Sequence, residues 1–300
     1  TLNPGNLLNN YGDFNNLGPD IYTVTVTDEN GCPGPEITDT INEPDALNFD
    51  LIDHTDITGC NGDATGSISV DGSGGTGTLT YTLSTGISNT SGDFNGLTAG
   101  TYSVEMNDDN GCGPISTGNI VIDEPEAITI SDVTHSDVTC YNGTNGSITV
   151  TASGGTGNLS YTLQPANVTN NTGQFDDVPA GTYTVDVNDE NDCGPVSTGN
   201  IVIDEPTAIS IDGTSSSNIT CNGAADGSIT VNASGGTGTL TYTLQPDGTS
   251  NTTGEFTSLT ADTYTVEVTD ENGCGPATTS QIDLTEPAAI TITDTSHTDV

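Results

Sequence analysis

The chain has 300 residues, of which 42 are Asp or Glu and none is Lys or Arg, so its formal net charge is −42. A chain without cationic side chains cannot neutralise phosphate, which excludes nucleic acid as a partner. Anionic membrane surfaces should repel it, and no apolar run is long enough for direct membrane insertion.

The sequence repeats with a period of about 81 residues, as from Cys140 to Cys221. One block reads GSISVDGSGGTGTLTYTL from Gly66, and near-copies begin at Gly146 and Gly227. A second block ends in Asp-x-Asn and a cysteine, and the copies meet at short Glu-Pro joints. Self-similarity of this kind indicates a repeat architecture. Each Pro fixes its own φ and restrains the residue before it, so we expect short, stiff joints.

The Glu-Pro joints set the expected boundaries. We predict that residues 1–46 are the second half of a repeat. Three full copies then follow, and the last residues begin another; these ranges are 47–127, 128–208, 209–289 and 290–300. Because the chain starts and stops within a repeat, we expect it to be an internal segment of a longer protein.

Within each copy, the strongly apolar segments alternate with period two. In the copy 128–208, the residues expected to face the core are Ile148, Val150, Leu159, Tyr161, Leu163, Tyr183, Val185 and Val187. Gly-rich SGGTG, and Asp-Glu-Asn before a cysteine, are typical of turns. The prediction is an all-β fold, a tandem array of small immunoglobulin-like antiparallel β-sandwiches with six or seven strands each.

Each full copy carries an early cysteine, at 60, 140 or 221, and a late cysteine, at 112, 193 or 274. A hydrophobic core this small gives only marginal stability. A disulfide that closes a loop of about 50 residues adds roughly 4 kcal/mol to the free energy of unfolding. We favour pairing within a copy, as Cys60–Cys112, Cys140–Cys193 and Cys221–Cys274. The alternative is pairing between neighbours, as Cys32–Cys60, Cys112–Cys140 and Cys193–Cys221.

The segment CNGAADGSITVNASGGTGTLTYTL from Cys221, with LTADTYTVEVTDENGCG up to Gly275, resembles the SprB repeat. The shared elements are Cys-Asn-Gly, the Gly-Ser-Ile-Thr-Val strand, Gly-Gly-Thr-Gly, the Thr-Tyr-Thr-Val strand and Asp-x-Asn-Gly-Cys. That repeat recurs in long secreted surface adhesins of gliding bacteria. The resemblance implies cell-surface display, adhesion and extension, and it implies no catalytic residues.

Catalysis and calcium binding are the two alternatives to a plain structural role. His54, His135 and His297 lie at equivalent repeat positions without a catalytic partner, so we expect no enzyme and solvent-facing histidines. Clustered carboxylates could bind Ca²⁺, although the same Asp-x-Asn-Gly pattern also builds hairpin turns. The candidate calcium ligands are Asp108, Asp109, Asp189, Asp270 and Glu271. No cofactor is required.

These observations favour a structural extracellular protein that forms a stalk or filament at the cell surface. The alternative is an adhesin that binds glycans or a partner surface, with calcium as a possible aid. The expected partners are therefore like chains or a surface ligand. Isopeptide cross-links are excluded, because they need a Lys amine and the chain has none.

Overall fold

The computed structural model describes residues 1–297, and those residues contain β-strands and no helix. The chain divides into two compact units, Thr1–Glu126 and Ala127–Val300. Every pairing between strands is antiparallel, as in β13 (Thr129–Ser136) with β14 (Gly146–Ser153). The all-β prediction is confirmed.

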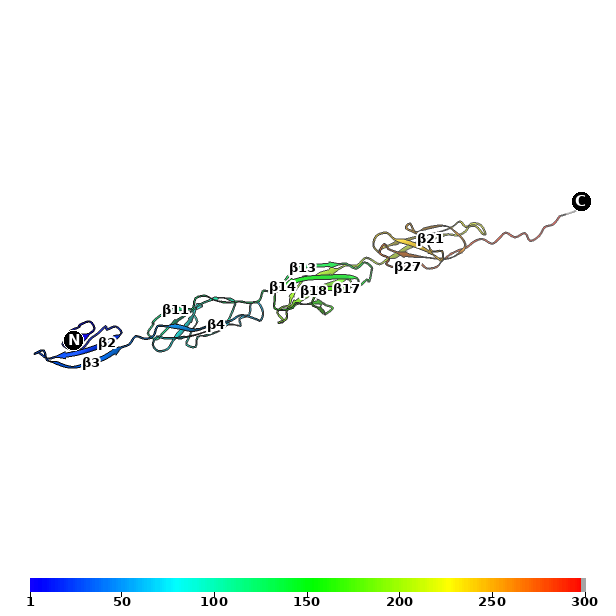
Figure 1. Ribbon diagram of the computed structural model, residues 1–300. Helices are drawn as coiled ribbons and strands as arrows, with labels where there is room; N and C mark the ends of the chain where they lie inside the picture. The colour runs from blue at the N-terminus through cyan, green and yellow to red at the C-terminus, as the bar shows by residue number, and fades with distance from the viewer. Residues whose placement is uncertain (298–300) are drawn as a thin grey trace. The chain divides into compact units, whose positions relative to one another are not determined.

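The copy 128–208 folds as two facing sheets (green in Figure 1). The first sheet has the order β13-β14-β17, where β17 is Gln174–Val178. The second has the order β16-β15-β18-β19, and β20 pairs with the beginning of β18. Its strands are β16 (Val168–Asn170), β15 (Ser160–Gln164), β18 (Gly181–Asn188), β19 (Val196–Ser197) and β20 (Ile201–Ile203).

Alternation places the core between these sheets. Ile148 and Val150 of β14 are 0% and 2% exposed, and Val185 and Val187 of β18 are fully buried. Tyr161 and Leu163 of β15 complete the contact, as predicted. The copy has more strands than the six or seven expected. An edge strand such as β19, with two residues, is too short to show the period-two alternation on which the prediction depends.

The other two full copies repeat this plan with their own hydrophobic clusters. In 209–289 the first sheet is β21 (Ser210–Ser217), β22 (Gly227–Ser234) and β25 (Glu255–Leu259), and the second is β24 (Thr249–Asn251), β23 (Thr241–Gln245), β26 (Asp262–Thr269), β27 (Ala277–Thr278) and β28 (Ile282–Leu284). In 47–127 the first sheet is β4 (Asn48–Thr55), β5 (Gly66–Ser73) and β8 (Asp93–Leu97). The second sheet has the order β11-β10-β6-β7, with strands β11 (Ile115–Ser116), β10 (Val104–Asn107), β6 (Thr80–Leu83) and β7 (Ser88–Asn89). The strands β9 (Gly100–Tyr102) and β12 (Ile120–Ile122) pair with each other.

Residues 1–46 form one sheet, β1 (Leu2–Asn3), β2 (Asp20–Thr27) and β3 (Pro33–Ile41). Val26 is 63% exposed, although its sequence equivalent Val187 is fully buried. The difference follows from the strands present, because residues 1–46 supply no second sheet to cover this face. The domain boundaries themselves stay a prediction.

A turn glycine offers a test of how tightly the sandwich is built. Gly173 has φ +72°, and a Cβ there would overlap the carbonyl oxygen of Val150. Gly173→Ala is therefore expected to lower the free energy of unfolding by roughly 2–4 kcal/mol. Gly248 has the same φ of +72° and open space around it, so Gly248→Ala should cost only about 1 kcal/mol.

Thermal and denaturant unfolding of both variants would measure these losses. Equal losses would mean that the backbone angle alone matters and that the Val150 contact does not.

Candidate functional site: the joint between two repeats

In each of the three full copies, the Glu-Pro joint that ends the copy is bonded to the loop that carries the early cysteine of that copy. In 128–208 the Asn142 N–H donates to Glu205 Oε2 at 2.7 Å, and the Val138 N–H donates to the Asp204 carbonyl at 3.1 Å. Gly62 donates to Glu124 at 2.6 Å and Gly223 to Glu286 at 2.7 Å in the same way. Proline was the predicted source of stiffness at the joint. The glutamate before it adds a second restraint, because its side chain accepts a backbone N–H group from the loop.

The far side of the joint lies against the Gly-Gly turn of the following copy. The Gly236 N–H donates to the Thr207 carbonyl at 2.8 Å. Gly235 has φ +86°, and a Cβ there would overlap the Ala208 carbonyl oxygen. Gly74 and Gly154 meet Ala46 and Ala127 in the same manner. Only glycine lets the joint backbone approach this closely, which explains the recurrent Gly-Gly.

A buried aspartate shapes the hairpin of the late cysteine and ties it to the Gly-Gly turn. Asp270 is 4% exposed. Its Oδ1 accepts the N–H groups of Asn272 at 3.0 Å and Cys274 at 2.8 Å. Its Oδ2 accepts the Thr237 N–H at 2.8 Å. Burial acts to raise the pKa of this carboxyl, but the donated hydrogen bonds outweigh it and hold the pKa below the usual Asp value.

The calcium candidates occupy this same kind of turn. Asp108 and Asp189 accept the equivalent N–H groups, from Cys112 at 2.7 Å and from Cys193 at 2.9 Å. Asp109 accepts the Thr78 N–H at 2.9 Å. Residues 1–297 contain no group of three or more His, Cys, Asp or Glu side chains arranged to hold a metal. The geometry supports the turn role, and calcium binding stays a prediction.

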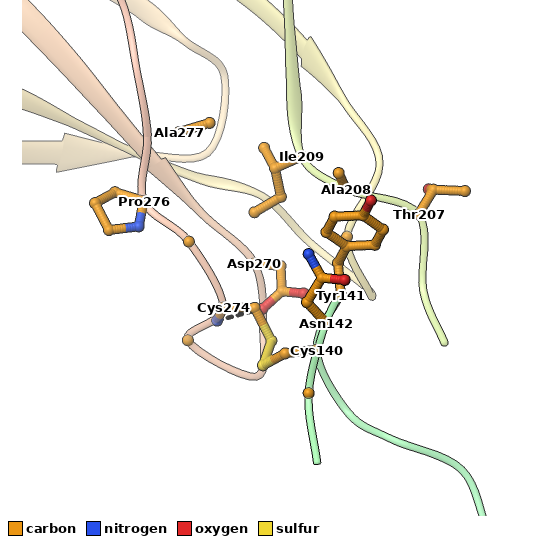
Figure 2. A pocket seen from close by; sticks show the side chains of 14 residues that line it. Cys140, Tyr141, Asn142, Thr207, Ala208, Ile209, Asp270, Cys274, Pro276 and Ala277 are labelled. Carbon is orange, nitrogen blue, oxygen red and sulfur yellow. Dashed lines mark hydrogen bonds between the residues drawn. A yellow bond between two sulfur atoms is a disulfide. The ribbon is translucent and has the colours of Figure 1, made fainter. Parts of the chain in front are cut away.

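A disulfide crosses the joint between the copies 128–208 and 209–289. Cys140 is bonded to Cys274, with Cα atoms 5.5 Å apart and a sequence separation of 134 (Figure 2). The Asn272 amide donates to the Thr139 carbonyl at 3.3 Å beside it. The early cysteine of one copy therefore pairs with the late cysteine of the next.

The predicted pairing within each copy is wrong. Cys140 pairs with Cys274 rather than Cys193, which excludes Cys140–Cys193 and Cys221–Cys274. Among residues 1–297 the free thiols are those of Cys32, Cys112 and Cys221, which also excludes Cys60–Cys112. The same free thiols overturn the alternative scheme, Cys32–Cys60, Cys112–Cys140 and Cys193–Cys221. Neighbouring copies are stapled, as that scheme proposed, but through a different pair of cysteines.

The physical reason is that the two cysteines of one copy lie at opposite ends of its sandwich. The loop of Cys140 is bonded to the exit joint, through Val138 and Asp204. The hairpin of Cys193 is bonded to the Gly-Gly turn at the entry joint, through Asp189 and Thr156 at 2.8 Å. Sequence spacing carries no sign of this separation.

A cavity of about 620 Å³ lies beside the disulfide (Figure 2). Its walls include Tyr141 and Asn142 from one copy, Thr207 and Ala208 from the joint, and Pro276 from the next copy. Tyr141 is 49% exposed and follows the early cysteine, where the other copies have asparagine. Those asparagines, Asn61 and Asn222, donate to the carbonyls of Pro125 and Pro287. This local departure from the repeat was not predicted, although the aligned copies contain the signal.

The histidines lie away from this joint chemistry. His54 Nε2 is 3.8 Å from Asp56 Oδ1, and the two side chains are 41% and 47% exposed. His135 is exposed on β13. The predicted solvent-facing positions are thus confirmed for these two.

The comparisons with known proteins match the repeat. The SprB repeat model matches residues 53–87, 133–168 and 213–249, which confirms the resemblance. No curated protein sequence matches the chain. The described residues contain no helix long and apolar enough to cross a membrane.

Solved structures with detectable similarity include a surface layer protein, an intimin fragment and FN domains. Domains 1–6 of the surface layer protein SbsC align at 13% identity and TM-score 0.26, covering 91% of this chain and 46% of that one. The intimin fragment bound to the intimin-binding domain of its receptor aligns at 16% identity and TM-score 0.27, covering 55% and 67%. The chicken CNTN1 FN1–FN3 domains align at 13% identity and TM-score 0.26, covering 80% and 98%. The chain spans less than half of that SbsC structure, and scores this low carry no functional argument.

The disulfide assignment can be tested by mapping thiols. Alkylation of the unreduced chain is expected to label Cys32, Cys112 and Cys221 and to spare Cys140 and Cys274. Because trypsin has no cleavage site here, digestion at acidic residues and mass spectrometry would identify the linked peptides. A peptide joining Cys140 to Cys193 would contradict the structure.

The hairpin carboxylate predicts a pH dependence. A folded-state pKa held below the unfolded value stabilises the protein above the unfolded pKa, about 3.9 for Asp, and this stability is lost as pH falls through the folded pKa. Asp270→Asn should be less stable at neutral pH and should lose less stability on acidification. Asp247→Asn removes an exposed charge and serves as the control. Parallel acid curves for wild type and Asp270→Asn would refute this role.

Proposed function

Because the chain contains three SprB repeats, a repeat of extracellular surface proteins, we propose that it is a structural segment of a stalk or filament at the cell surface. The observation that carries this proposal is the closed joint between 128–208 and 209–289. A Glu clamp, a Gly-Gly contact and the Cys140–Cys274 disulfide all act at one short connection.

Such a joint suits a protein that keeps its two ends far apart, as a stalk does. A flexible linker between sandwiches would let neighbouring copies reorient freely. Here the connecting residues donate and accept backbone hydrogen bonds on both sides, and a covalent bond bypasses them. The non-enzymatic prediction is supported by the repeat family and by the use of the buried carboxylates in turns.

Small-angle X-ray scattering would test the stalk. A compact 300-residue globule has a radius of gyration of about 19 Å, and we expect at least twice that value for the chain. The value should change little between low and moderate salt, because the joints resist bending. A radius near the compact value would overturn the proposal.

A second candidate function, adhesion, is favoured by the cavity at Tyr141. A half-exposed aromatic ring beside the Asn142 amide is a surface suited to neutral sugar rings. Anionic glycans are disfavoured because no Lys or Arg is present. A panel of neutral glycans would test this, with Tyr141→Asn restoring the residue of the other copies. Binding that survives this substitution would exclude the cavity as the site.

Assembly between like chains requires that their charge be screened. A net charge of −42 repels neighbouring copies, and divalent cations between exposed carboxylates would reduce that repulsion. We propose calcium in this bridging role. Electron microscopy should find ordered bundles with calcium and separated chains after chelation, and bundles unchanged in excess EDTA would exclude it.

A further inference from the structure

The strand β4 forms one edge of the first sheet in the copy 47–127 (Figure 1). The sheet has the order β4-β5-β8, so one side of β4 pairs with β5, and the other side pairs with no strand of residues 1–297. Such an edge presents backbone N–H and C=O groups to which another strand can bind. A further strand can therefore extend this sheet.

The open part of this edge is short, and both of its ends are defined. At one end the register with β5 shifts at Asp50, which is the extra residue of a β-bulge. Beyond the other end the Ile57 N–H donates to the Asp123 carbonyl at 2.9 Å, so the chain there already has a partner. A docked strand would therefore pair along Leu51–Thr55.

This edge carries two successive apolar side chains that are exposed. Leu51 is 48% exposed and Ile52 is 47% exposed. At the aligned positions after the bulge, the other two full copies have Asp132 and Val133, and Gly213 and Thr214. Because those copies form the same kind of sheet, the fold itself does not require an apolar pair here.

The apolar pair reaches both faces of the sheet. In the register with β5, Leu51 is opposite the exposed Asp71, and Ile52 is opposite the buried Val70. Successive residues of a strand point to opposite faces. A docked strand with two successive apolar residues would therefore cover Leu51 on one face and Ile52 on the other.

Carboxylates flank the apolar pair. Asp50 precedes it, Asp53 follows it, and Asp56 lies near the end of the edge, and all three are exposed. Pairing with the β4 edge of a second copy would bring three carboxylates from each copy together, and opposed like charges destabilise a strand pair. The chain has no Lys or Arg to compensate them. The charge of the edge therefore disfavours a like chain and favours a strand that carries Lys or Arg.

We propose that β4 is a docking edge for another protein, which adds an extended strand with two successive apolar residues between basic residues. The apolar residues cover Leu51 and Ile52, and the basic residues lie near Asp50 and Asp53. Backbone hydrogen bonds supply affinity, and the side chains supply specificity. This site belongs to one copy and depends neither on the proposed stalk nor on the cavity at Tyr141.

Fluorescence anisotropy with two labelled peptides and the full chain would test the docking edge. The matched peptide is Thr-Lys-Val-Ile-Lys-Thr, and the control peptide has the same composition in the order Val-Lys-Thr-Thr-Lys-Ile. A polyanion attracts both peptides alike, but only the matched peptide places its apolar pair between the lysines. We expect the matched peptide to bind about tenfold more tightly at moderate salt.

Leu51→Asp separates docking from general attraction, because it introduces the residue of the copy 128–208 and also adds a negative charge. Docking predicts that the matched peptide binds about tenfold more weakly, whereas general attraction predicts tighter binding. Ile87→Asp is the matched control. It makes the same charge change at a residue that is 58% exposed between β6 and β7, outside the sheet of β4, and should not weaken binding.

If Leu51→Asp does not fold, Ile52→Thr takes its place, because it introduces the residue of the copy 209–289, and the same weakening is expected. Amide hydrogen exchange along Leu51–Thr55 should slow when the matched peptide is bound to wild type. The docking edge would be overturned by equal affinity for the two peptides, by no binding of either peptide, or by variants at Leu51 and Ile52 that bind as wild type does.

Discussion

The constraint on which the rest of the structure depends is that forty-two carboxylates must be accommodated without one Lys or Arg. A carboxylate that leaves water needs hydrogen-bond donors, and here the main source of donors is the backbone. The buried hairpin aspartates Asp108, Asp189 and Asp270 accept backbone N–H groups, as Asp270 does from Cys274. The exposed joint glutamates accept backbone N–H groups as well, as Glu205 does from Asn142. These carboxylates thereby hold the hairpin turns and the joints in place.

This use of backbone donors explains where the unusual residues occur. A carboxylate that collects several N–H groups requires a tightly curled main chain, so glycine or asparagine with positive φ follows the early cysteines, as at Gly62 and Asn142. The Gly-Gly turn meets the same demand from the other side, because the joint backbone lies directly against Gly235. The joints are therefore ordered by contacts of the main chain with itself and with the joint glutamate.

The placement of the disulfide then shapes the energetics. A bond within a copy would stabilise each thin sandwich by itself, whereas Cys140–Cys274 makes two neighbours depend on one another. Repeat proteins gain much of their stability at the interfaces between repeats, and a covalent interface extends that principle.

The sequence by itself determined the strands, the repeat and the turns, because these depend on local patterns. Period-two alternation identified the buried faces at Ile148 and Val185, and Asp-x-Asn identified the hairpins. Only the tertiary structure decided the cysteine pairing, because two cysteines in one copy lie at opposite ends of a sandwich, and spacing along the chain does not record distance in space. The cavity at Tyr141 also needed the fold, since its walls come from two copies and the joint between them.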